Sequence, residues 1–218
     1  MMLLLLLFGE LAALYILSGA LTQAGFELLL RLTRSRTIAV TAVTLIVFPG
    51  TVIHELSHLF TAEILGVKTG KLTLVPENIR EEEIKAGSVM IARSDPFRRY
   101  LIGLAPVVAG LVAVTTLSLG WGFWGVWGNV GILYILFSVS SSMFSSKEDL
   151  KGFIPFAVTL AIMIGAAYFA GLRIGLTGPA LSVTEKILTA LTKSLGLVVG
   201  INLAGLILTK GAIRIIRK

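Results

Sequence analysis

The chain has 218 residues, of which 56% are hydrophobic and only 14% are charged, and its mean hydropathy is +0.92. Soluble domains carry about 25% charged residues, so this composition excludes an ordinary soluble domain. The sequence contains no cysteine, which excludes disulfide bonds and thiolate metal sites. The net charge of +7 is typical of proteins that face either nucleic acid or a membrane surface.

Apolar blocks long enough to cross a bilayer, which takes about 20 residues, recur along the chain. The first contains Glu10 and has no basic stretch before it, so we expect a retained helix rather than a signal peptide. The sequence therefore predicts an all-α polytopic membrane protein with about six transmembrane helices, which form one domain over residues 1–218. The six blocks are residues 2–24, 37–59, 100–120, 129–145, 153–172 and 191–209.

The second block contains both histidines of the chain. They lie in FPGTVIHELSHLFTAEILG, residues 48–66, where His54, Glu55 and His58 form the pattern H-E-x-x-H. Two imidazoles one helical turn apart share a face and can bind one zinc ion, and Glu55 can take a proton from a metal-activated water. Ionisable groups inside a membrane span are usually functional. The alternative is that both histidines are ordinary helix residues bonded to their neighbours.

A small polar insertion separates the second and third blocks, over about residues 67–99. Lys71–Pro76 and Gly87–Arg93 have the composition of two short strands, which predicts a β-hairpin between helices 2 and 3. The edge of such a hairpin can pair with an extended peptide. Alternatively, the hairpin is structural and covers the site. The acidic residues of this insertion are expected to be solvated.

A catalytic zinc ion needs a third protein ligand, and the sequence has no further histidine. Glu63 lies nine residues after His54, about 180° away around a helix. The segment SVSSSMFSSKEDLKG, residues 138–152, ends on the same side of the membrane as the second helix. We therefore favour Asp149 as the third ligand, with Glu148 in reserve; the alternative is a plain charge cluster at a membrane exit. Two acidic residues near the first helix stay open as remote candidates: Glu10 and Glu27.

The basic residues indicate how the chain is oriented. Short cytoplasmic loops collect lysine and arginine. With six crossings and the N-terminus inside, most of the 19 basic residues lie in cytoplasmic segments. We therefore expect an integral protein of the cell membrane with both termini cytoplasmic. The lipid bilayer accounts for the basic charge, so no nucleic-acid partner is expected.

An H-E-x-x-H motif in an apolar helix, followed two helices later by an acidic residue near a helix end, resembles the site-2 protease type of intramembrane zinc metalloprotease (the M50 class). The resemblance covers about residues 40–152. It implies that the chain hydrolyses peptide bonds of membrane-anchored proteins or peptides. It also implies that Zn²⁺ is held by His54, His58 and Asp149 and that Glu55 is the catalytic base. Where the family tends to have a Gly-Pro pair in the third helix, this chain has Ala105-Pro106.

Two other functions use the same residues. A membrane metal-binding or transport protein needs the ligands but not a base, so the intact Glu55 favours a hydrolase. A degenerate homologue with a structural role needs neither. Asn202 in the last block is a distant candidate for stabilising a reaction intermediate, although bonding between helices is the favoured interpretation of this residue.

Overall fold

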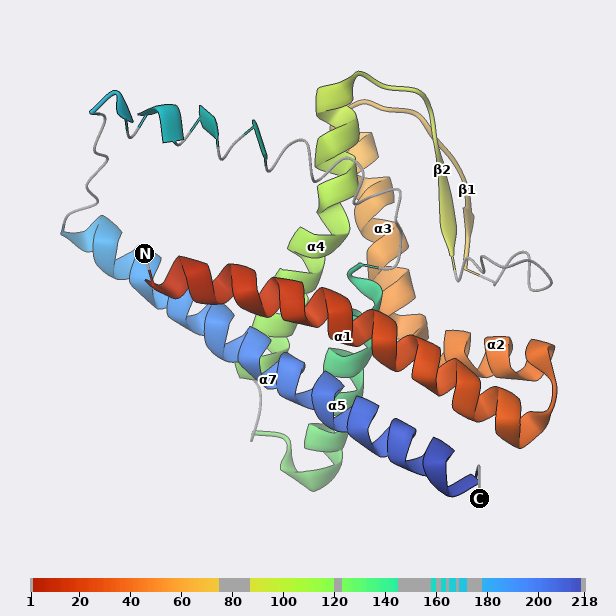
Figure 1. Ribbon diagram of the computed structural model, residues 1–218. Helices are drawn as coiled ribbons and strands as arrows, with labels where there is room; N and C mark the ends of the chain where they lie inside the picture. The colour runs from red at the N-terminus through yellow and green to blue at the C-terminus, as the bar shows by residue number, and fades with distance from the viewer. Residues whose placement is uncertain are drawn as a thin grey trace.

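The computed structural model describes residues 2–74, 87–119, 123–144 and 178–216, together with short stretches between residues 158 and 171. Within these residues all regular structure is helical except for one two-stranded antiparallel sheet. The expected all-α architecture with a small β-hairpin is thus confirmed (Figure 1). The elements are α1 (Met2–Thr33), α2 (Arg36–Ile46), α3 (Phe48–Ile64), β1 (Thr69–Thr73), β2 (Ser88–Ile91), α4 (Pro96–Leu119), α5 (Gly125–Ser142) and α7 (Pro179–Ile216).

Four of the described helices are long and apolar enough to cross a membrane, namely α1, α4, α5 and α7. A fifth crossing results if the bent pair of α2 and α3 is counted as one span. The six expected crossings are therefore not all found in the described part of the chain. The expected block at 153–172 lies largely outside the described residues.

The second apolar block is broken in the middle. Helix α2 ends at Ile46, α3 begins at Phe48, and the two axes meet at 69°. Pro49 falls in the first turn of α3, a position where a missing N–H costs nothing and the fixed φ favours a helix start. The bend corrects the expectation of one helix over residues 37–59, and it turns the H-E-x-x-H segment away from the axis of α2.

Helix α5 holds this break in place. The N–H of Gly50 is one of the first-turn donors that lack an intrahelical partner, and it donates to Ser138 Oγ at 2.9 Å. Ser142 Oγ donates to the carbonyl of Val47 at 3.4 Å. Polar groups at the break are thus satisfied by side chains from a distant helix, as burial within a membrane protein requires.

Helices α1 and α7 lie side by side and run in the same direction (Figure 1). Glu10 lies against Gly196, and eleven residues later Leu21 lies against Gly205. The chain termini therefore lie at opposite ends of this helix pair. Six crossings would instead bring both termini to one face. Helices α3 and α4 pack together, and α4 crosses this pair and contacts α7 (Figure 1).

The largest apolar cluster lies where α1, α4, α5 and α7 meet. Its buried members interlock leucine, valine and methionine side chains, and apolar packing of this kind aligns these four helices. The buried members are Leu14, Val114, Leu136, Val139, Met143, Leu195 and Val198.

Candidate metal centre

The polar residues of α3 form one buried stripe. The exposed fractions of His54, Glu55 and His58 are 3%, 6% and 7%. Residues four apart on a helix lie on the same face, so these side chains point to the protein interior and not to lipid. Ionisable side chains in membrane spans take this orientation when they serve a site. The buried positions of the stripe are Gly50, Thr51, His54, Glu55, His58 and Ala62.

The Nε2 atoms of the two imidazoles lie close to each other. His54 Nε2 lies 3.2 Å from His58 Nε2, and the two rings are nearly perpendicular, at 84°. Two Zn–N bonds of about 2.0–2.1 Å at a tetrahedral angle hold their nitrogens about 3.3–3.4 Å apart. The observed separation therefore fits two neighbouring corners of a zinc tetrahedron.

The other ring nitrogen of His58 is held by α4. His58 Nδ1 lies 2.8 Å from the carbonyl oxygen of Ile102. A carbonyl only accepts, so a hydrogen bond here requires the proton on Nδ1, and a neutral ring then has its lone pair on Nε2 for a metal. The contact is kept in place by a small apolar cluster of Ala62, Val67 and Ile102, which joins the end of α3 to the start of α4.

The β-hairpin lies directly against Glu55. Strands β1 and β2 pair antiparallel, with Leu72 opposite Val89 and Thr73 opposite Ser88. A Cβ atom at Gly87, just before β2, would lie 3.0 Å from Glu55 Oε1. The main chain at this glycine thus approaches the carboxylate closely.

The structure does not complete the predicted ligand set. Within the described part of the chain, no group of three histidine, aspartate or glutamate side chains is arranged to hold a metal. Asp149 and Glu148, the favoured and reserve third ligands, lie outside the described residues. The candidate site that the structure does describe therefore consists of two imidazole nitrogens and a neighbouring carboxylate.

The other acidic candidates have different surroundings. Glu63 is exposed and accepts a hydrogen bond from Thr69 at 3.1 Å. Glu27 pairs with Arg31 at 2.6 Å, and Glu10 lies against Gly196 of α7. These contacts give each of the three acids a position away from the histidine pair.

Asn202 forms a side-chain hydrogen bond between two helices. Its side chain is fully buried, and its Nδ2 donates to Ser140 Oγ at 2.9 Å and to the carbonyl of Val198 at 3.0 Å. It therefore ties α7 to α5, in line with the favoured interpretation of this residue. Two serines of α5 thus have structural roles. Ser140 accepts a hydrogen bond from Asn202, and Ser138 accepts one from the N–H of Gly50 in the first turn of α3.

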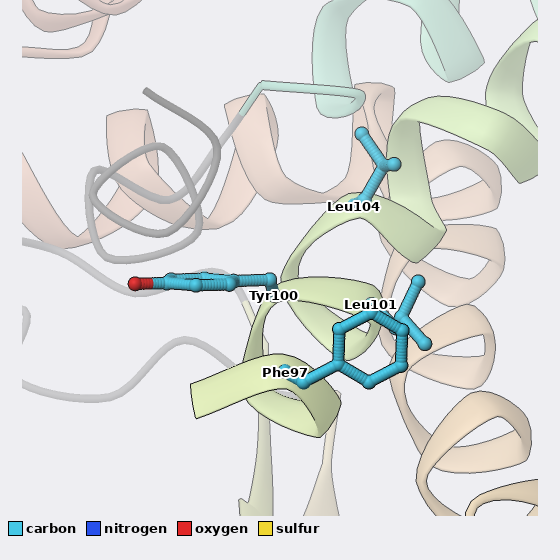
Figure 2. A pocket seen from close by; sticks show the side chains of 4 residues that line it. All are labelled: Phe97, Tyr100, Leu101 and Leu104. Carbon is cyan, nitrogen blue, oxygen red and sulfur yellow. The ribbon is translucent and has the colours of Figure 1, made fainter. Parts of the chain in front are cut away.

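Two hollows of the described structure lie apart from the histidine pair, since neither is lined by His54, Glu55 or His58. One, of about 10 Å³, lies on the first turns of α4 and has space for no more than one water (Figure 2). The other, of about 260 Å³, lies beside the break between α2 and α3. Its lining is Leu21, Thr22, Gly25, Leu28, Leu29, Val43, Ile46, Val47, Phe137 and Thr209. Both are lined by uncharged side chains, so the histidine pair remains the candidate site.

Comparison with known proteins gives no relatives: no family model, curated protein or solved structure matches this chain.

Proposed function

We propose that this protein is an intramembrane zinc metalloprotease that hydrolyses peptide bonds of membrane-anchored substrates. The observation that carries the proposal is the 3.2 Å separation of the two histidine Nε2 atoms inside a buried, apolar surrounding. Two lone pairs repel each other at this distance unless a proton or a cation lies between them. The tetrahedral spacing favours zinc as that cation.

The residues of α3 have separate roles in this proposal. A bound zinc ion would supply Lewis acidity and lower the pKa of a water molecule toward 7. His54 and His58 would hold the ion through Nε2, and Asp149 would supply the third ligand. Glu55 accepts the proton of the attacking water and then donates it to the amide nitrogen of the leaving peptide. The low-dielectric surrounding strengthens each of these interactions.

The carboxylate distinguishes a hydrolase from a metal carrier. A transport or storage site needs only ligands, whereas Glu55 is buried beside the histidines. A glutamate buried beside two imidazoles is positioned to exchange a proton with a metal-activated water, and this placement favours a hydrolase. The hairpin beside Glu55 gives an extended substrate peptide a strand to pair with, and its role as a simple cover remains the alternative.

The deciding experiment is the metal content of the purified protein in detergent. We expect about one zinc ion per chain in the wild type, since a single tetrahedral centre is proposed. The ion should be lost in His54→Ala, His58→Ala and Asp149→Ala. Glu63→Ala is the control and should keep its zinc, because Glu63 bonds to Thr69 instead.

The other outcomes are equally informative. Zinc lost from the two histidine variants but kept in Asp149→Ala would show that another residue is the third ligand. Absence of stoichiometric metal from the wild type after zinc repletion would contradict the proposal and would favour a structural role for the chain.

A further inference from the structure

The carbonyl of Ile102 is available to His58 because of a proline one turn later in α4. In an α-helix the carbonyl of residue 102 accepts from the N–H of residue 106. Residue 106 is Pro106, which lies inside α4 and is buried. Proline has no N–H, and its ring pushes against the carbonyl four residues earlier. The helix itself therefore leaves this carbonyl without its usual donor.

A buried carbonyl needs a partner, since an unsatisfied one is costly away from water. Ile102 is only 4% exposed, so solvent is a poor substitute. His58 Nδ1 fills this place at 2.8 Å. The unpaired acceptor of α4 and the ring N–H of α3 thus satisfy each other across the helix interface.

We propose that Pro106 is a positioning residue for His58. It reserves the Ile102 carbonyl for the imidazole, which fixes the proton on Nδ1 and aims the Nε2 lone pair at the point shared with His54. The inference rests on the proposed metal site for its purpose, but the tautomer it predicts exists with or without a metal. An ordinary residue at position 106 would bring an N–H that competes for the same carbonyl.

The test is Pro106→Ala, with two readouts. Partners that orient a metal-binding histidine typically contribute about 10–100-fold in metal affinity, so we expect zinc affinity to fall by about tenfold or more. Imidazole ¹⁵N spectra of the metal-free protein report the tautomer directly, and His54 and His58 are the only two histidines. We expect His58 to carry its proton on Nδ1 in the wild type and to populate the Nε2–H form in the variant.

Pro49→Ala is the matched control. Pro49 lies in the first turn of α3, where a new N–H claims no carbonyl of that helix. We expect zinc affinity within about twofold of the wild type, since the partner of His58 is untouched.

The outcomes separate this inference from the proposed function. If the wild type binds no zinc but shows the Nδ1–H tautomer, and Pro106→Ala loses it, the metal site is wrong and the role of Pro106 stands. If Pro106→Ala keeps both the wild-type tautomer and the zinc affinity, Pro106 has no positioning role. An Nε2–H tautomer of His58 in the wild type would overturn the inference even if the variant failed to fold.

Discussion

At the scale of single residues, Glu55 is the residue that separates hydrolysis from metal binding in the proposed function. Its carboxylate is buried on the same face of α3 as the two histidines, and the main chain at Gly87 lies against it. A carboxylate can accept and return a proton, whereas the amide of glutamine has nearly the same shape but cannot. A substitution of Glu55 by glutamine should therefore separate metal binding from hydrolysis.

We expect Glu55→Gln to keep about one zinc ion per chain and to lose hydrolysis by at least about 100-fold, the usual contribution of a general base. The measurement is cleavage of fluorescent single-span peptides in detergent micelles, beside zinc content. Glu63→Gln is the control, because Glu63 is an exposed residue of the same helix. Equal cleavage by Glu55→Gln and the wild type would show that Glu55 is not the base.

At the scale of elements, the position of α3 depends on its contact with α5. The Gly50 N–H donates to Ser138 Oγ, and a Cβ atom at Gly50 would lie only 2.1 Å from the Ser138 carbonyl oxygen. The clash would be with main chain, which has no rotamer to change. The absence of a side chain at Gly50 is therefore required for the bent pair of α2 and α3 to rest on α5.

We expect Gly50→Ala to destabilise the protein by about 1–3 kcal/mol, the usual cost of overpacking. The measurement is thermal unfolding in detergent, followed by circular dichroism. Gly131→Ala provides the comparison, because a Cβ atom there meets nothing within 4 Å. That variant should be neutral or stabilised by up to about 1 kcal/mol, since alanine favours a helix over glycine. Equal melting of the two variants would count against the close packing at Gly50.

At the scale of the whole molecule, the parallel pair of α1 and α7 sets where the termini lie. Both helices are long and apolar enough to cross a membrane. Glu10 lies against Gly196 and Leu21 against Gly205, so the contacts follow the same order along both helices. If both helices cross the membrane, they begin on the same face, and the start of α1 and the end of α7 then lie on opposite faces. The distribution of basic residues instead predicts one face for both termini.

The natural lack of cysteine makes this arrangement easy to test with Met2→Cys and Ile216→Cys as single labelling sites. Both positions are exposed ends of the parallel helices. A membrane-impermeant maleimide added to sealed vesicles should label one variant and, after the vesicles are opened, both. Labelling of both variants from the same face would contradict the parallel arrangement as a pair of membrane spans.

The sequence by itself determined the features that depend on neighbouring residues. Hydropathy averaged over about 20 residues predicts where helices are, and the spacing of His54 and His58 predicts that they share a face. The strand-like composition of Lys71–Pro76 and Gly87–Arg93 predicts the hairpin. These properties follow from local periodicity and propensity. The described residues confirm the all-helical architecture and the hairpin, but not the six crossings.

Only the tertiary structure decided what surrounds those residues. Pro49 and Pro106 were visible in the sequence, but not that Ser138 satisfies the start of α3 or that His58 takes the carbonyl which Pro106 leaves free. Each of these bonds joins residues at least 44 positions apart. A helix pattern shows which polar groups lack a local partner, but the partner depends on how the helices pack. The sequence pattern does not show that α1 and α7 run parallel, because this too depends on how the helices pack.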